Sequence, residues 1–155
     1  MATLRLIQIM FLINNPLIHE YDQLLLTWEA SVRATHDFLA EVDIVEFREL
    51  LRDQYFYVVN LFCIRNNNND AIAGFIGVAG VRLEMLFIHP SLMKIGLGKM
   101  LLDYATRELK VTKVDVNEQY SGALAFYKNL GFKVIGRSEL DATGKRYPIL
   151  HLQLS

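Results

Sequence analysis

Apolar residues recur along this chain with two different spacings, which predict helices and strands. A spacing of three and four residues begins at Tyr21, as in one buried helical stripe, and predicts a helix that ends near Arg33. Asp43, followed by Glu46 three residues later, resembles a capping box and predicts the start of a second helix. Similar spacings predict two more helices, one from Gly96 and one over residues 123–130.

Short runs rich in branched and aromatic residues, bounded by turn signals, predict the strands. These runs cover residues 4–13, 57–64, 71–78, 82–89, 111–116, 132–135 and 149–154. The order of elements predicts a single α/β (α+β) domain over residues 1–155. We expect a mixed, mostly antiparallel central sheet of about seven strands, flanked by four helices.

The first predicted strand also has a feature of secretory signals, because a basic residue precedes its apolar run. Gln8 interrupts the run, and Asn14, Asn15 and Pro16 follow it without a small-x-small cleavage site. About 20 apolar residues would be needed to cross a bilayer. We therefore expect a strand here and neither a signal nor a membrane anchor.

The composition excludes several classes of protein. With 52% hydrophobic and 21% charged residues, the chain matches a packed globular domain and not a disordered one. Its formal net charge of -1 provides no field that would attract nucleic acid or an anionic membrane. The single cysteine, Cys63, predicts a buried, inert thiol and a reducing, cytoplasmic compartment. The four histidines lack paired spacing, so we expect no metal site.

The most informative segment joins the strand over residues 82–89 to the helix that begins near Gly96. Gly96 and Gly98 lack a Cβ atom, so backbone N–H groups can approach an anion closely there, and the start of a helix adds partial positive charge. Lys94 and Lys99 add formal charge. This glycine loop predicts a phosphate-binding turn, with tight strand-to-helix packing as the alternative.

Two known phosphate motifs do not fit the glycine loop. A P-loop requires a glycine where Met93 stands and a Ser or Thr where Met100 stands. A dinucleotide-binding fingerprint requires a glycine or alanine where Leu101 stands. These two classes of nucleotide-binding protein are therefore excluded.

A second segment, residues 116–132, completes a pattern that begins with the glycine loop. It resembles the x-N-x-x-N-x-x-A-x-x-F-Y-x-x-x-G-F stretch of the GCN5-related N-acetyltransferases. Residues 28–39 and 136–148 are similar to the YjaB-type subfamily, so the resemblance covers nearly the whole chain. The matching positions of the stretch are Asn117, Ala123, Phe126, Tyr127, Gly131 and Phe132.

The resemblance implies an enzyme that uses acetyl-CoA as its acetyl donor. It implies that backbone N–H groups near Phe87 and Ile88 bind the acetyl carbonyl and the pantetheine. It also implies a set of residues that hold the rest of acetyl-CoA, namely Lys94, Ile95, Gly96, Leu97, Gly98, Lys99, Asn117 and Ala123.

Two positions depart from the family pattern. Met93 stands where Arg or Gln usually begins the glycine loop, so backbone donors, with Lys94, carry more of the binding. Tyr120 stands where a second Asn is common. These departures motivate a function of another class, a non-catalytic acyl-CoA-binding or sensor module. A phosphate or nucleotide binder that uses the glycine loop alone is a third alternative.

Acetyl transfer to an amine needs a group that gives a proton to the departing thiolate and a group that takes a proton from the amine. Tyr127 matches the family tyrosine whose hydroxyl faces the cofactor sulfur, and an ordinary pKa of about 10 leaves it protonated near neutral pH. Glu84 is the candidate base, because strand alternation places it on one face with Leu86 and Ile88. A core tyrosine and a solvated glutamate are the alternatives.

The resemblance places the segment between the first two helices beside the acceptor, an amine of a small molecule or of a protein. His36 lies in this segment, and its ordinary pKa predicts titration near neutral pH, with a turn role as the alternative. Trp28, Phe38 and Tyr147 are predicted to shape the acceptor pocket, with core packing as the alternative. The hydrophobic composition would accommodate a homodimer.

Overall fold

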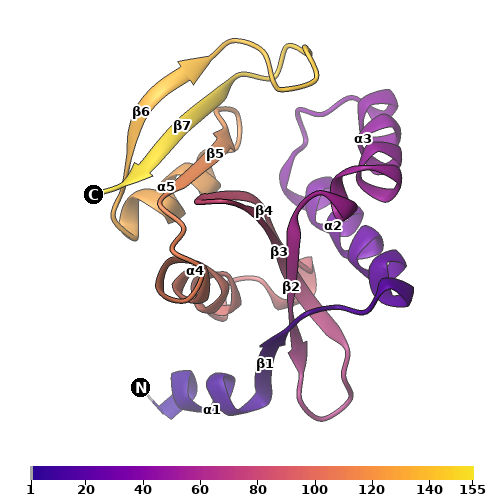
Figure 1. Cartoon of the computed structure of the whole chain (residues 1–155), viewed down its shortest axis with the longest axis vertical. Helices are drawn as coiled ribbons and strands as arrows, with labels where there is room; N and C mark the ends of the chain where they lie inside the picture. The colour runs from indigo at the N-terminus through magenta and orange to yellow at the C-terminus, as the bar shows by residue number, and fades with distance from the viewer. Residues whose placement is uncertain (1) are drawn as a thin grey trace.

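The computed structural model describes residues 2–155 and contains one seven-stranded sheet, in the order β1-β2-β3-β4-β5-β7-β6 (Figure 1). Neighbouring strands are antiparallel except for β4 and β5, so the predicted mixed, mostly antiparallel sheet is confirmed. The strands are β1 (Phe11–Asn14), β2 (Asn60–Asn66), β3 (Ile72–Ala79), β4 (Arg82–Ile88), β5 (Lys113–Asn117), β6 (Phe132–Ser138) and β7 (Ile149–Leu154). The helices are α1 (Ala2–Met10), α2 (Tyr21–Thr35), α3 (Glu41–Asp53), α4 (Leu97–Arg107) and α5 (Ser121–Asn129).

The N-terminal segment contradicts the predicted strand over residues 4–13 and adds a fifth helix to the four predicted. Helix α1 takes most of the segment, and only Phe11–Asn14 is extended, as β1. A nearly continuous apolar run does not distinguish a helix from a strand by its spacing. Phe11 already lies opposite Asn66, the last residue of β2, so an earlier strand would have no pairing partner. No helix among residues 2–155 is both long and apolar enough to cross a membrane.

Several other predicted boundaries are wrong by two or three residues; β6, for example, extends to Ser138 instead of ending at residue 135. Helix α3 begins at Glu41 with Ala40 as its N-cap, so Asp43 lies inside the first turn and does not cap the helix. The carboxylate of Asp43 instead contacts the β6–β7 connection, as described below. Residues 55–57 form a short 3-10 helix, and β2 begins at Asn60.

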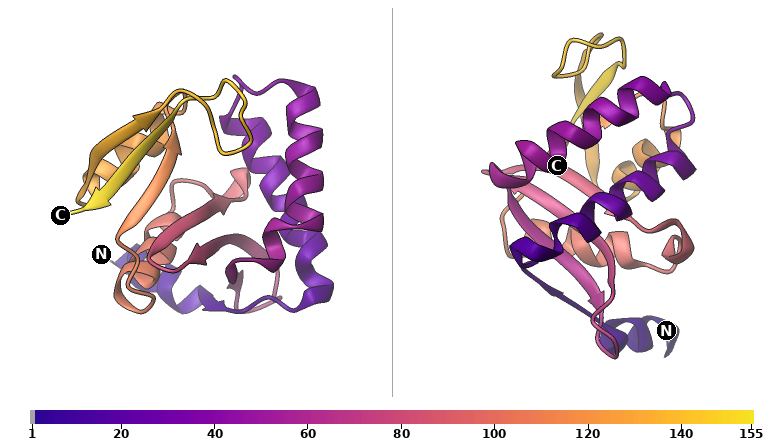
Figure 2. Two further views of the ribbon diagram at one scale, coloured as in Figure 1. Left: turned by 45° about the horizontal axis from the view of Figure 1, so that its top comes forward. Right: turned by 90° about the vertical axis from the view of Figure 1, so that its right-hand side faces the viewer.

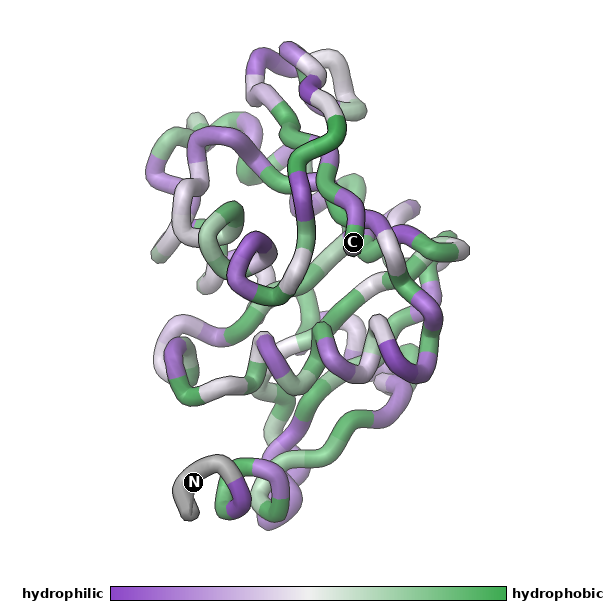
Figure 3. The backbone as a smooth tube through the Cα atoms, turned by 90° about the vertical axis from the view of Figure 1, so that its left-hand side faces the viewer, coloured by the Kyte–Doolittle hydropathy of each residue, from purple (hydrophilic) through white to green (hydrophobic). Residues whose placement is uncertain are grey.

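Helices cover both faces of the central strands, and each face has its own hydrophobic core (Figures 1 and 2). Helices α2 and α3 cover one face, where Cys63 and Phe75 are fully buried. Helix α4 covers the other face, where Ile64 and Ile76 are fully buried. Neighbouring residues of a strand thus enter opposite cores, as strand alternation requires. Figure 3 accordingly shows hydrophobic residues along the middle of the molecule. Because Cys63 is buried in this way, the pKa of its thiol is raised.

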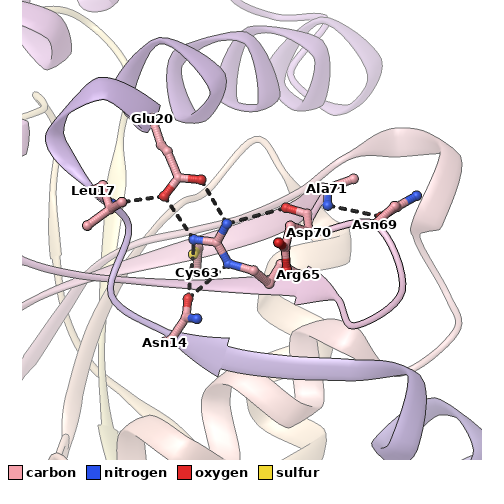
Figure 4. A network of polar contacts seen from close by, with 8 residues as sticks. All are labelled: Asn14, Leu17, Glu20, Cys63, Arg65, Asn69, Asp70 and Ala71. Carbon is pink, nitrogen blue, oxygen red and sulfur yellow. Dashed lines mark hydrogen bonds and ion pairs between the residues drawn. The ribbon is translucent and has the colours of Figure 1, made fainter.

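A buried ion pair joins the short 3-10 helix Ile18–Glu20 to strand β2 (Figure 4). The Arg65 guanidinium donates to both carboxylate oxygens of Glu20, at 2.8 and 3.0 Å, and its Nε donates to Asn14 Oδ1 at 3.0 Å. Glu20 also accepts the Leu17 N–H at 2.9 Å. These bonds, that from Arg65 most of all, lower the pKa of Glu20 to about 2. The network fixes the connection between β1 and α2.

Strand β4 contains one residue more than the part of β3 that it faces. Leu83 and Met85 pair with the consecutive β3 residues Val78 and Gly77, so Glu84 between them is unpaired and forms a β-bulge. Leu83 enters the core under α4, whereas Met85 enters the core under α2 and α3. The bulge breaks alternation only between Leu83 and Met85, because from Met85 onward Leu86 and Ile88 again lie on the side of the core under α4.

Beyond the bulge, β4 and β5 separate (Figures 1 and 2). The two parallel strands pair only through Arg82 with Lys113 and Leu83 with Val114. Strand β5 continues to Asn117 and pairs with β7 on its other side. The facing edges of β4 and β5 therefore have no strand partner after the second pair.

Candidate active site

A cavity of about 570 Å³ lies between the separated strands β4 and β5 and helices α4 and α5. The predicted site residues that line it are Glu84, Phe87, Ile88, Lys94, Gly96, Leu97, Gly98, Lys99, Asn117, Ala123, Tyr127 and His36. The predicted site residues outside its lining are Ile95, Trp28, Phe38 and Tyr147. The cavity thus joins the glycine loop, the open edge of β4 and the helix of the second motif.

The glycine loop presents free backbone N–H groups at the start of α4. Lys94 and Gly96 adopt left-handed conformations, with φ of 67° and 102°. Such turns point successive N–H groups toward a common anion. The first intrahelical bond runs from the Met100 N–H to the Gly96 carbonyl at 3.0 Å. The N–H groups of the first three helical residues therefore have no partner in the helix and are available to an anion.

The described residues around Gly98 leave room for a side chain, so packing within the protein does not explain the glycine. A Cβ atom at this position would meet Phe126 at 3.5 Å, an ordinary contact distance. The absent side chain leaves the backbone open to the cavity, where a ligand could approach it closely. With Lys94 and Lys99 beside the same cavity, the loop fits the pyrophosphate of a CoA thioester.

The open edge of β4 supplies a further backbone donor. The His89 N–H donates to the Ala73 carbonyl of β3 at 2.8 Å. Because backbone groups alternate in direction along a strand, those of Phe87 also point to β3, whereas those of Ile88 point to the side where β5 has separated. Of the two predicted carbonyl-binding residues, Ile88 therefore offers its N–H to the cavity.

Tyr127 combines a buried ring with an accessible hydroxyl. The residue is 6% exposed, and its ring packs edge-on against Phe126 and Phe132, with centroids 5.1 and 5.7 Å away. The hydroxyl has no hydrogen-bond partner among the described residues, yet no fully buried side-chain nitrogen or oxygen there lacks one. The hydroxyl is therefore accessible from the cavity that Tyr127 lines. Burial raises the pKa of this phenol and keeps it protonated.

Two carboxylates line the cavity near the point where β4 and β5 separate. Arg82 contacts both, with its Nε 3.9 Å from Glu84 Oε1 and its Nη1 2.9 Å from Asp115 Oδ1. His151 of β7 contacts Asp115 Oδ1 through Nδ1 at 2.7 Å. Partial burial raises the pKa of Glu84, with Asp115 adding to the shift and Arg82 opposing it. Glu84 therefore binds a proton more strongly than an ordinary glutamate.

The sequence did not single out Asp115, which lines the cavity, or its partner His151, which lies outside the lining. Asp115 stands between the buried residues Val114 and Val116, and this alternation is the signal that could have placed it on the face away from the core. His151 comes opposite Asp115 only through the antiparallel register of β5 and β7. A single sequence contains no direct signal for that register.

His36 follows α2 and borders the cavity as a neutral ring. It is 8% exposed and packs against Phe38 and Tyr120, with ring centroids 5.3 and 4.7 Å away. Burial lowers the pKa of His36 to about 4, with Asp37 opposing the shift. The prediction that His36 titrates near neutral pH is therefore wrong, because an imidazolium here would lose its hydration. Tyr120 fits because Gly122 has no Cβ, which would come within 2.9 Å of the tyrosine ring.

The β6–β7 connection reaches toward α3 (Figure 2). The Tyr147 hydroxyl accepts the Ala40 N–H at 3.1 Å and donates to the Asp43 carboxylate. Lys145 Nζ lies 3.2 Å from Asp43 Oδ1 and 2.8 Å from Glu46 Oε2. We call this set of contacts the clasp. It joins the two parts of the molecule that flank the separated strands.

The other predicted residues outside the cavity lining have different surroundings. Trp28 packs in the core under α2 and α3. Phe38 lies between His36 and Tyr147, with ring centroids 5.3 and 6.0 Å away. Ile95 is an exposed residue of the glycine loop. Phe38 and Tyr147 therefore support the wall formed by His36.

Comparison with known proteins relates these features to one family. Residues 40–147 match the family described as Acetyltransferase (GNAT) domain. The peptidyl-lysine N-acetyltransferase YjaB of Salmonella typhimurium is 40% identical over 133 residues, which cover 86% of this chain and 90% of that protein. The protein of the same name from Escherichia coli is 38% identical over 133 residues, which cover 86% of this chain and 89% of that protein.

Solved structures show the same fold. The solution structure of apo-form YjaB from Escherichia coli has a TM-score of 0.84 at 36% identity and covers 92% of this chain and 96% of that one. The PaiA N-acetyltransferase of Thermoplasma acidophilum, solved in complex with coenzyme A, has a TM-score of 0.70 at 19% identity and covers 94% and 99% of the two chains. The chain therefore belongs to the GNAT family and is an acetyl-CoA-dependent N-acetyltransferase.

Proposed function

We propose that this enzyme transfers the acetyl group of acetyl-CoA to the side-chain amines of lysine residues in proteins. The two related proteins described above are named peptidyl-lysine N-acetyltransferases. The observation that carries the proposal is a single cavity that contains the glycine loop, the accessible hydroxyl of Tyr127 and the carboxylate of Glu84. A free small-molecule amine is the alternative acceptor.

In this proposal the glycine loop holds the pyrophosphate of acetyl-CoA. The free N–H groups at the start of α4 donate to the phosphate oxygens, and Lys94 and Lys99 add positive charge. Asn117 and Ala123, on the opposite wall of the cavity, contact the pantetheine chain. Backbone donors carry this binding, since Met93 contributes only an apolar side chain to the lining.

The remaining groups serve the transfer itself. Acetyl-CoA supplies the acetyl group and a thiolate as the leaving group. As the amine nitrogen attacks, a C–N bond forms and the C–S bond breaks. The Ile88 N–H donates to the carbonyl oxygen and stabilises its developing negative charge. Glu84 takes a proton from the acceptor ammonium before the attack, directly or through water. Tyr127 gives its proton to the departing sulfur and regains one from the acetylated nitrogen, which loses its excess proton as the amide forms.

The acidic end of the cavity favours a cationic acceptor. Glu84 and Asp115 both line it; Arg82 contacts both carboxylates, and the His151 ring also contacts Asp115. A lysine ammonium is attracted to such a site, whereas a carboxylate is repelled. The raised pKa of Glu84 then suits it to receive the proton that the ammonium must lose before attack.

The experiment follows thiol release from acetyl-CoA with a lysine-containing peptide as the acceptor. We expect Tyr127→Phe to keep the acetyl-CoA affinity of the wild type, measured by calorimetry, because only the hydroxyl is lost. We expect its kcat to fall by roughly 10²- to 10⁴-fold, the contribution of a general acid. Tyr104→Phe is the matched control, because Tyr104 lies on α4, packs against Phe62 and is outside the lining of the cavity.

Each other outcome supports a different function. Wild-type turnover in Tyr127→Phe would remove this residue from the mechanism. Binding of acetyl-CoA and CoA without turnover of any amine would indicate an acyl-CoA-binding module. Competition by ATP as effective as that by CoA would indicate a nucleotide binder. Acetylation of free amines but not of peptides would replace the proposed acceptor.

A further inference from the structure

The two ring nitrogens of His36 have different surroundings, and these determine which nitrogen bears hydrogen. The Thr35 hydroxyl donates its only hydrogen to the Ser31 carbonyl, 2.7 Å away. The same hydroxyl oxygen lies 2.7 Å from His36 Nδ1, so in this second contact the oxygen accepts and Nδ1 donates. The neutral ring therefore carries its hydrogen on Nδ1 and a lone pair on Nε2.

The lone pair of Nε2 is accessible from the cavity. Nε2 has no hydrogen-bond partner within residues 2–155, yet no fully buried side-chain nitrogen or oxygen there lacks one. His36 is only 8% exposed, and the cavity is the space that it lines, so we assign the accessible nitrogen to that space. Phe38 and Tyr120 pack against the ring and fix its orientation. A buried acceptor held in one orientation is suited to bind a donor from a substrate.

We propose that His36 Nε2 accepts an N–H of the acceptor amine and positions its nitrogen for attack on the acetyl carbon. This inference rests on the proposed function. A lysine ammonium has three N–H groups and no lone pair. When His36 accepts one N–H and Glu84 takes the proton of another, the lone pair left on the nitrogen is free to form the C–N bond.

Two properties of the site indicate that His36 acts as a hydrogen-bond acceptor and not as a general base. Burial keeps the imidazole neutral at physiological pH, so His36 binds hydrogen without removing a proton. Thr35 lies outside the lining of the cavity, yet its hydroxyl determines the tautomer of the neighbouring ring. Thr35 is therefore a positioning residue that acts through His36.

The tautomer is measured first, by nitrogen-15 NMR of the intact protein without acetyl-CoA or acceptor. The His36 signals are assigned by their loss in His36→Phe. We expect hydrogen on Nδ1 and none on Nε2 at neutral pH. Thr35→Ser, which retains the hydroxyl, should show the same pattern, and Thr35→Val should lose it. Hydrogen on Nε2 in the wild-type protein would overturn the inference.

The second measurement compares kcat/KM for a lysine peptide. His36→Phe keeps an aromatic ring beside Phe38 and Tyr120 but removes the hydrogen-bond-accepting nitrogen. We expect kcat/KM to fall roughly tenfold, a barrier increase of about 1.4 kcal/mol, with unchanged affinity for acetyl-CoA. His36→Gln supplies an amide oxygen as acceptor and should recover part of the loss. Thr35→Val leaves the imidazole ring in place, and we expect its kcat/KM to be lowered as well.

The results separate the two proposals. If the wild-type enzyme acetylates the peptide and His36→Phe retains its full kcat/KM, the inference about His36 fails and the proposed function stands. If the wild-type enzyme binds acetyl-CoA and acetylates no lysine peptide, the proposed function fails and takes the inference with it.

Discussion

Two glutamates of this chain have pKa values shifted in opposite directions. Glu20 accepts two hydrogen bonds from buried Arg65, which lower its pKa to about 2. Glu84 is partly buried beside Asp115, which raises its pKa. Glu20 is therefore a permanent anion that stabilises the fold, whereas Glu84 can exchange a proton closer to neutral pH. The surroundings assign the two roles, since the side chains are chemically identical.

Removal of Glu20 should destabilise the protein, because it leaves the Arg65 charge buried without a partner. We expect Glu20→Ala to lower the free energy of unfolding by about 3 kcal/mol, the low end for a buried pair because the Glu20 side chain retains 12% exposure. Urea unfolding at pH 7 measures this loss. Asp53→Ala breaks the exposed pair with Arg52 and should leave the unfolding midpoint unchanged.

The same pair predicts how stability depends on pH. The pKa of Glu20 in the folded protein, about 2, is below its usual value of 4.5. The stabilisation is therefore complete above pH 4.5 and is lost as the pH falls toward 2. The difference in unfolding free energy between wild type and Glu20→Ala should shrink over that interval. A difference that stays constant throughout would contradict the assigned pKa.

Among the elements, the unit formed by β4, the glycine loop and α4 supplies the backbone donors of the site. The bulge at Glu84 separates β4 from β5 and exposes the Ile88 N–H. The left-handed residues Lys94 and Gly96 then turn the chain so that α4 starts at the cavity. Side-chain identity matters little for these donors, which is consistent with Met93 at a position usually taken by Arg or Gln.

Gly98→Glu should abolish this anion site while leaving the fold intact. The position has ordinary room for a Cβ, so we expect little change in the unfolding temperature. A carboxylate beside the proposed pyrophosphate should weaken acetyl-CoA binding at least tenfold, or about 1.4 kcal/mol, in a calorimetric titration. Gly98→Gln has the same size without the charge and should bind more tightly than Gly98→Glu. Unchanged affinity in both variants would place the pyrophosphate elsewhere.

The sequence predicted the elements whose signals are local. The glycine loop, the stripe of α5 and the six strands from β2 to β7 have their own turn residues or spacing, and the structure contains all of them. The bulge at Glu84 could not be predicted, because it depends on the residues of β3 opposite it. The pairing of His151 with Asp115 depends likewise on the register between β5 and β7. Helix α1 was missed because an apolar run without a clear period fits either element.

At the scale of the whole molecule, the clasp holds the β6–β7 connection against helix α3, on the side where we propose that the acceptor binds. Tyr147 and Lys145 come from the β6–β7 connection, and both contact Asp43 of α3, about a hundred positions earlier in the chain. The ring of Tyr147 also packs against Phe38, which in turn packs against His36. The position of the His36 ring thus depends on contacts that span the molecule.

Loss of the Tyr147 hydroxyl should therefore weaken binding of the acceptor peptide more than binding of acetyl-CoA. Tyr147→Phe removes the bonds to the Ala40 N–H and to Asp43 but keeps the ring. We expect KM for a lysine peptide to rise roughly two- to tenfold, about 0.4–1.4 kcal/mol, with unchanged affinity for acetyl-CoA. Tyr57→Phe, at an exposed tyrosine, is the matched control. Equal losses of affinity for both substrates would assign Tyr147 a general structural role.

The extra residue of β4 shows that the identity of a residue and the number of residues in a strand have different effects on the site. A substitution at Glu84 would change the charge at one end of the cavity, but the strand would keep its length and β5 would remain apart. Loss of one residue from β4 would instead remove the bulge and allow the two parallel strands to continue their hydrogen bonding. The chemistry of the site is thus encoded by the kinds of residue present, while the space for its two substrates is encoded by their number.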